Sequence, residues 1–290
     1  PLVVTSGFGS YRYGHFHAGV DFSTGGKIGR PVYAVQDGEI VRVRASYTGY
    51  GKALYERLEN GEIVLYAHLS RFSRSLERRL RNYQKRRRRY RADILLEPPL
   101  KVREGEIIAF SGASGAGPPH LHFEWRTKEG FSIDPLKRLG IAESLSLSLN
   151  RVVFSSRGDE PWEVEVRPGS NDTLVISSSF RVFAAINERF ENGRVRSGIP
   201  EKLVVTFDGD SVFSLDFFQI DPRGINGEAL YSKNYDFPLL SLFRPNYLIW
   251  DQVRGLTHMN PSPGLHRLEI SLVNEESEKV TIPLYVVDSL

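Results

Sequence analysis

From Pro31 to Phe110 the chain is divided into short runs of β-forming residues by turns that contain glycine. The turn dipeptides are Asp37-Gly38, Tyr50-Gly51, Asn60-Gly61 and Glu104-Gly105. Short apolar and β-branched segments bounded by such turns predict antiparallel β-structure with few helices. The predicted strands cover residues 31–35, 39–44, 53–58, 62–67 and 106–110.

One segment of this half has a helical period instead. Phe72, Leu76, Leu80 and Tyr83 recur at intervals of four, four and three residues. That spacing places the four side chains on one face of a helix, which we predict over 71–89.

Strand-like sequence returns after this helix, over residues 91–96. Proline cannot donate to a strand ladder, so Pro98-Pro99 is expected to end that strand.

Alternating runs continue beyond Gly140, with turn residues at Pro168-Gly169, Asp208-Gly209 and Pro263-Gly264. Repeated short strands of this kind predict a β-sandwich of immunoglobulin-like type. A chain of 290 residues is long enough for two domains, and we place them at 1–140 and 141–290. The predicted strands of the second domain cover residues 144–153, 163–166, 173–176, 181–185, 202–207, 266–273 and 281–287.

Composition narrows the chemistry that the chain can perform. Cysteine is absent, which excludes disulfides, thiolate metal sites and cysteine nucleophiles. No stretch approaches the roughly 18 apolar residues of a membrane span. The formal net charge is +3, but the positive charge is concentrated in one segment. Residues 71–91 hold eleven Arg or Lys and one acid, Glu77. The remainder of the chain is net acidic, so the basic character belongs to one segment.

Five polar residues stand in three places that suit one kind of chemistry. His17 and Asp21 flank Ala-Gly-Val, His68 ends Tyr-Ala-His, and His120 and His122 alternate in His-Leu-His. The glycines around the aspartate disfavour a helix, so an extended segment is expected there. Residues two apart on a strand share a face, so His120 and His122 should point to the same side while their apolar neighbours face a core.

Imidazole and carboxylate groups are good zinc ligands, and a catalytic zinc usually has three protein ligands and one open position. His17, Asp21 and His122 can fill three such positions. Zinc activates water and polarises a scissile carbonyl, which leaves His68 and His120 to move protons or to stabilise the oxyanion. A lone histidine is more often a packing or surface residue, so the joint occurrence of the motifs carries the interpretation.

Five sequence blocks occur together in a fixed order. They are HAGVDF (17–22), PVYAVQDG (31–38), YAHLS (66–70), SGASG (111–115) and PHLHFE (119–124). Together they resemble the lysostaphin-type (LytM) zinc endopeptidases over roughly residues 7–137, most closely the larger envelope members that add a C-terminal β domain.

The resemblance implies a mainly β fold. It implies a peptidase domain of the antiparallel, duplicated hybrid motif type over 1–140, with a basic helical insert at 71–100. An immunoglobulin-like β-sandwich over 141–290 would follow as an accessory domain.

The resemblance also implies a zinc-dependent endopeptidase that hydrolyses peptide cross-links or bridges of bacterial peptidoglycan. Carried over by position, His17, Asp21 and His122 match the metal ligands, and Zn²⁺ is the expected cofactor. His68 and His120 match the catalytic histidines, and which of the two is the general base is left open.

A peptidoglycan substrate implies export to the periplasm or cell envelope, and membrane anchoring ahead of Pro1 is left open. The expected partners are peptidoglycan stem peptides, a cell-wall or divisome protein, and an anionic envelope polymer bound through Arg86, Arg87, Arg88 and Arg89. The same arginine-rich helix is equally consistent with a lid over the groove or with a solvated surface that only shapes the fold.

Two other functions compete with hydrolysis. A catalytically silent regulator of another cell-wall hydrolase would use the same fold without metal, so metal content separates the two. A nucleic-acid-binding protein is suggested by the run Arg86–Arg89, but the acidic remainder of the chain argues against it, and no nucleic acid is expected.

Overall fold

A computed structural model of the 290-residue chain shows two compact units. The first consists of Pro1–Phe8, His17–Glu143 and Gln219–Gly224, and the second of Gly9–Phe16, Ser144–Phe218 and Ile225–Leu290. The residues that the structure describes are 2–12, 15–141, 146–156, 162–170, 172–189, 193, 195–198, 200–222, 231–232, 239–242, 253–256, 259–273 and 277–287.

This division differs from the predicted boundary in two short segments. Strands β2 (Tyr11–Arg12) and β3 (His15–Phe16) pair with each other in the second unit. Strand β21 (Gln219–Ile220) pairs with β13 (Ser132–Ile133) of the first unit. The second exchange depends on pairing between residues far apart in sequence, which a linear reading of composition does not reveal.

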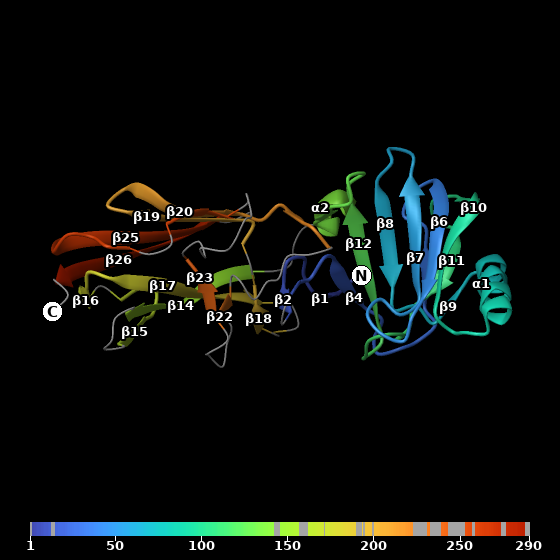
Figure 1. Cartoon of the computed structure of the whole chain (residues 1–290), viewed down its shortest axis with the longest axis horizontal. Coiled ribbons are helices and arrows are strands. Elements are labelled where there is room, and N and C mark those ends of the chain that lie inside the picture. The colour runs from blue at the N-terminus through green and yellow to red at the C-terminus, as the bar shows by residue number, and fades with distance from the viewer. Residues whose placement is uncertain are drawn as a thin grey trace. The chain divides into compact units, whose positions relative to one another are not determined.

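The first unit is built on one large antiparallel sheet in the order β1-β4-β12-β8-β7-β6-β10. Figure 1 shows β12, β8, β7, β6 and β10 side by side in that order. Strand β13 pairs with β12 at one side of this path and with β21, and a separate small sheet has the order β5-β11-β9. The bounds are β1 Val4–Ser6, β4 Val20–Ser23, β5 Pro31–Tyr33, β6 Gly38–Ala45, β7 Ala53–Leu58, β8 Ile63–Ala67, β9 Arg71–Phe72, β10 Ala92–Val102, β11 Ile107–Phe110 and β12 His120–Arg126.

The five strands predicted between Pro31 and Phe110 are present as β5, β6, β7, β8 and β11. The prediction that Pro98-Pro99 ends a strand is wrong, because β10 runs through both prolines to Val102. Its pairing with β6 shifts register between Leu95 and Leu100, so the prolines lie where the ladder is interrupted. A bulge of this kind tolerates residues that cannot donate a hydrogen bond.

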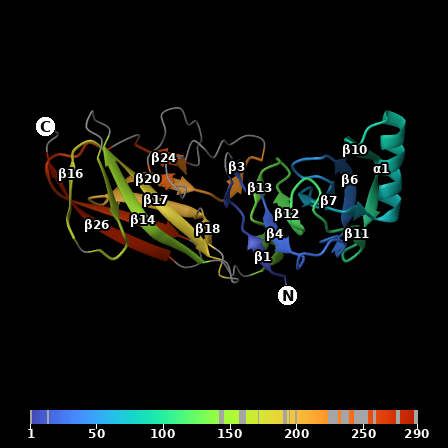
Figure 2. The ribbon, with the colours of Figure 1, turned by 90° about the horizontal axis from the view of Figure 1, so that it is seen from below.

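Helix α1 (Arg74–Arg87) is shorter than the helix predicted over 71–89, because Arg71 and Phe72 form strand β9 instead, and a second, short helix is α2 (Pro135–Leu139). Leu76 and Leu80 of α1 are fully buried in the core of the first unit. Figure 2 shows α1 beside β10 and β11. Whether α1 is an insert relative to other peptidases stays a prediction. Among the described residues, no helix has both the length and the apolar character that a membrane span needs.

The second unit has two six-stranded sheets, ordered β15-β14-β17-β23-β22, with β18 beside β17, and β16-β26-β25-β19-β20-β24. The predicted strands recur here, although residues 144 and 145 of the first one lie outside the described residues. An immunoglobulin-like topology stays a prediction. The bounds are β14 Ser146–Ser156, β15 Glu163–Val166, β16 Leu174–Ser177, β17 Phe180–Arg189, β18 Val195–Ser197, β19 Lys202–Phe207, β20 Asp210–Asp216, β22 Tyr231–Ser232, β23 Leu239–Ser241, β24 Val253–Gly255, β25 Gly264–Val273 and β26 Ser277–Val287.

Candidate metal centre and flanking histidines

Pairing of β4 with β12 brings the HxxxD and HxH motifs together. Asp21 of β4 lies directly opposite His122 of β12, and His17 enters the same place from the segment just before β4. Gly19 makes this approach feasible, because a Cβ atom at that position would lie 2.2 Å from the backbone oxygen of Phe123. A larger residue would push the start of β4 away from β12.

Three side-chain atoms converge at this point. His17 Nε2 lies 3.1 Å from Asp21 Oδ1, and His122 Nδ1 lies 2.9 Å from the same oxygen. The two nitrogens are 2.9 Å apart. All three residues are buried, at 6%, 7% and 5% exposure, so water screens this cluster weakly.

Hydrogen bonds on the far side of each ring fix which nitrogen faces the cluster. His17 Nδ1 donates to the carbonyl oxygen of Gly7 at 2.7 Å, and His122 Nε2 donates to Glu124 Oε1 at 2.8 Å. In the neutral rings, His17 Nε2 and His122 Nδ1 therefore carry lone pairs. Two nitrogen lone pairs and a carboxylate oxygen point at one centre, where they require a positive charge.

The pKa values of Asp21 and His122 also indicate that the cluster favours a positive charge. Burial acts to raise the pKa of Asp21, but the two imidazoles outweigh it and hold that pKa well below its usual range. Burial acts to lower the pKa of His122, but hydrogen bonds to Asp21 and Glu124 raise it to about 9. A proton on His122 or a cation at the centre can satisfy the carboxylate.

The donor set fits zinc. Two imidazole nitrogens and one carboxylate oxygen are ligands that zinc prefers, and three protein ligands leave one position open. Tetrahedral ligands about 2.0–2.1 Å from zinc lie about 3.3 Å from one another. The observed separations of 2.9–3.1 Å fall within a few tenths of an ångström of that value. Among the described residues, His17, Asp21 and His122 form the one group of three or more metal-binding side chains this close together.

His68 follows β8 and is held in a left-handed backbone conformation, with φ of 56°. Its Nδ1 donates to the carbonyl oxygen of Ser114 at 2.9 Å. Gly51 is required for this arrangement, since a Cβ atom there would lie 2.0 Å from the same oxygen. Burial lowers the pKa of His68 to about 4. At neutral pH the ring is therefore neutral, and its Nε2 is free to accept a proton.

His120 opens β12 on the same face as His122, as the alternation predicts. Its Nδ1 donates to the carbonyl oxygen of Pro118 at 2.7 Å, and its Nε2 lies 3.7 Å from Asp21 Oδ1. The rings of His68 and His120 lie 4.6 Å apart between centroids. Both rings thus have Nδ1 bonded to the backbone and Nε2 available beside the candidate metal centre.

A buried network behind His122 was not predicted from the sequence. Glu124 is fully buried, and its Oε1 accepts hydrogen bonds from His122 Nε2 and from the Tyr50 hydroxyl at 2.5 Å. Its other oxygen accepts from Arg126 Nε at 2.7 Å. The signal was present in the alternation of His120, His122, Glu124 and Arg126 along one face of a strand. Tyr50 gave no comparable signal.

The family model described as peptidase family M23 matches residues 15–85. Over these residues the chain is similar to peptidase family M23. The matched residues include His17, Asp21 and His68, whereas His120 and His122 lie beyond them.

Curated relatives match less than half of the chain. "DD-carboxypeptidase/endopeptidase Mpg" of Neisseria meningitidis is 33% identical over 121 residues, which cover 41% of this chain and 22% of that protein. "Lipoprotein NlpD/LppB homolog" of Pseudomonas aeruginosa is 28% identical and covers 43% of this chain and 34% of that protein. The catalytic domain of lysostaphin from Staphylococcus simulans is 26% identical, covers 48% of this chain and 92% of that chain, and gives a TM-score of 0.36. The chain thus spans about a fifth of the length of the Neisseria relative.

If the candidate centre holds zinc, Glu124→Gln is expected to weaken its binding about 10- to 100-fold, the usual cost of losing a residue that orients a metal ligand. The amide retains an acceptor for His122 Nε2 but loses the negative charge that balances Arg126. Affinity is measured by competition with a chromophoric chelator.

Glu56→Gln is the matched control for this substitution. Glu56 is also fully buried, but it binds the Tyr66 hydroxyl instead of the candidate metal centre. The Glu56→Gln substitution should therefore leave zinc affinity unchanged. Equal affinity of the Glu124→Gln variant and the parent would contradict the orienting role of Glu124.

Proposed function

We propose that the chain is a zinc-dependent endopeptidase that hydrolyses peptide cross-links or bridges of bacterial peptidoglycan. The observation that carries this proposal is the convergence of His17 Nε2, Asp21 Oδ1 and His122 Nδ1 beside two more imidazoles with free Nε2 atoms. The match to peptidase family M23 and the name of the Neisseria relative, which includes endopeptidase, support it.

His17, Asp21 and His122 would hold the zinc ion, with Glu124 fixing the orientation of the His122 ring. When bound, zinc polarises the scissile carbonyl and makes water more acidic. The neutral ring of His68 can accept the proton of the attacking water at Nε2 and later return it to the leaving amine. His120 has the same free nitrogen, so the two histidines share the proton transfer and the stabilisation of the oxyanion.

Purified peptidoglycan sacculi test this proposal. The protein is incubated with them, and mass spectrometry identifies the released fragments. We expect fragments with a new amino terminus in the peptide part and intact glycan linkages. Fragments cut only in the glycan would overturn the assigned reaction.

Such a substrate places the protein in the cell envelope as an exported protein, where a cell-wall or divisome protein is a candidate partner. The exposed arginines at the end of α1, Arg86–Arg89, are proposed to bind an anionic envelope polymer. Arginine forms paired hydrogen bonds with carboxylates and phosphates, which supports this assignment.

Replacing Arg86, Arg87, Arg88 and Arg89 with glutamine is expected to weaken sacculus binding several-fold at low salt, and added salt should weaken binding of the parent in the same way. Binding is measured by co-sedimentation.

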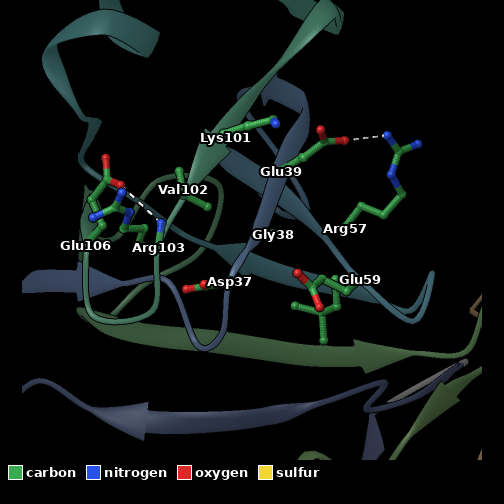
Figure 3. A pocket seen from close by; sticks show the side chains of 10 residues that line it. Asp37, Gly38, Glu39, Arg57, Glu59, Lys101, Val102, Arg103 and Glu106 are labelled. Atoms are coloured by element: carbon green, nitrogen blue, oxygen red, sulfur yellow. Dashed lines mark hydrogen bonds and ion pairs between the residues drawn. The ribbon is translucent and has the colours of Figure 1, made fainter.

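The control removes equal charge from exposed positions elsewhere in the first unit, at Arg57, Lys101, Arg103 and Lys128. Three of these residues line the pocket of Figure 3. Equal binding by both variants and the parent would identify the arginine run as a solvated surface.

A further inference from the structure

A pocket of about 720 Å³, here called the α1 pocket, lies between α1 and the small sheet that contains β9 and β11. Its lining is strongly cationic, with five basic residues and one acid. They are Arg71, Arg74, Arg78, Arg81, Lys85 and Glu77.

The single acid in this lining does not neutralise the bases. Glu77 accepts a hydrogen bond from the backbone N–H of Phe72 at 3.1 Å and pairs with Lys52 at 3.3 Å and with Arg81 at 3.4 Å. In the part of the chain that the structure describes, no carboxylate forms an ion pair with Arg71, Arg74, Arg78 or Lys85. Four positive charges thus remain available to a ligand.

A second pocket of similar size shows that this imbalance is local. Figure 3 shows its lining, which mixes four acids with three bases. Glu39 and Arg57 neutralise each other there, at 2.7 Å. The charges of that pocket nearly balance, whereas the α1 pocket has an excess of positive charge that favours an anionic ligand.

The cations of the α1 pocket have a regular spacing. Arg74, Arg78, Arg81 and Lys85 are separated by four, three and four residues, so they lie along one face of α1. With a rise of 1.5 Å per residue, the row is about 16 Å long and has a cation every 5–6 Å. An extended or helical chain with carboxylates at matching intervals would pair with the whole row.

Besides Arg71 of β9, the sheet side of the same pocket presents apolar side chains. Ile107 lines the pocket and is 42% exposed. Phe110 also lines the pocket, with the guanidinium carbon of Arg71 lying 3.8 Å from its ring centroid. Exposed apolar side chains beside a cationic row favour a ligand that carries both kinds of group.

We propose that this pocket is a docking site for an acidic, amphipathic segment of a partner protein. Its carboxylates would pair with Arg74, Arg78 and Lys85, and its apolar side chains would cover Ile107 and Phe110. An anionic polymer without apolar groups would satisfy the cations but leave the apolar side of the pocket exposed. This site is separate from the candidate metal centre and does not depend on hydrolysis.

The test uses a fluorescent 16-residue synthetic peptide with glutamates at matching intervals and leucines on the adjacent face, and follows binding by anisotropy. The triple variant Arg74→Gln, Arg78→Gln, Lys85→Gln should bind at least about tenfold more weakly, because three charge-assisted pairs are lost. Ile107→Thr retains a β-branched residue in the strand and should weaken binding about threefold or more, because part of the apolar contact is lost.

A matched control removes the same charge from exposed positions of the first unit outside the pocket, through Arg57→Gln, Lys101→Gln and Lys128→Gln. It should change the affinity by less than about twofold, since exposed charges beyond a contact are screened. Equal losses in the two triple variants would overturn the proposal, because they would indicate a diffuse attraction of charge.

Two further experiments test whether the pocket prefers a polyanion and whether the peptide binds at the metal centre instead. A peptide with glutamine in place of every leucine should bind more weakly than the amphipathic peptide, and inorganic polyphosphate should compete poorly. Equal binding of the two peptides, or stronger binding of polyphosphate, would show that the pocket takes a polyanion instead.

A zinc chelator should leave peptide binding unchanged, and loss of binding on chelation would place the peptide at the metal centre.

Discussion

Asp21→Ala is expected to abolish stoichiometric zinc binding, whereas the parent should hold about one zinc per chain. The substitution removes the only charged ligand of the proposed set and leaves two buried imidazoles close together. Two neutral nitrogens cannot balance the charge of a buried dication. Metal content is measured by inductively coupled plasma mass spectrometry after dialysis against a zinc buffer at neutral pH.

Asp93→Ala is the matched carboxylate control for this experiment. Asp93 lies on β10 and pairs with Arg42, apart from the proposed ligands, so its loss should leave zinc content unchanged. Zinc bound at the parent level by the Asp21→Ala variant would contradict the proposed ligand set. Absence of zinc from the parent would contradict the enzyme itself and favour the catalytically silent regulator.

His68→Ala and His120→Ala are expected to keep zinc and to lose hydrolysis by a factor of roughly 100 or more each. Neither ring belongs to the convergent set, so the metal should remain. Each ring presents a free Nε2 beside that set, and positioned groups of this kind usually supply such factors. Rates are measured as free amines released from sacculi, with zinc content determined on the same samples.

A histidine of the second unit serves as the control. His266 lies on β25 and is held by Asp208 at 2.7 Å, so His266→Ala should cleave at the parent rate. Parent-level hydrolysis by either the His68→Ala or the His120→Ala variant would remove that residue from the proposed mechanism. Loss of zinc in either variant would mean that the ligand set is wider than proposed.

Much of the first unit follows from local sequence. Gly-containing turns delimit strands of the expected length, and the apolar spacing from Leu76 to Tyr83 corresponds to α1 with one buried face, although Phe72, the first residue of that spacing, lies on β9. Strand alternation also predicts the shared face of His120 and His122. In each case the periodicity of one element determines the result.

Features that depend on long-range pairing were not predictable in this way. The Ser114 carbonyl that holds His68 comes from a loop 46 residues away, and sequence could not distinguish that loop from a plain turn. Glu124 resembles an ordinary surface residue until β12 is placed at the centre of a sheet, where its carboxylate is fully buried. Strand β10 continues through Pro98-Pro99 because a register shift, invisible in the sequence, accommodates the prolines.

Zinc titration of the metal-free protein tests the central claim most directly. Chelated and dialysed protein is mixed with sacculi, zinc is added in steps, and the rate of amine release is recorded at each step. The proposed function predicts no release without metal, a rise that reaches its plateau near one zinc per chain, and no rise for the Asp21→Ala variant. Amine release by the metal-free protein at the parent rate, or zinc binding without any release at the plateau, would contradict a zinc peptidase built on His17, Asp21 and His122.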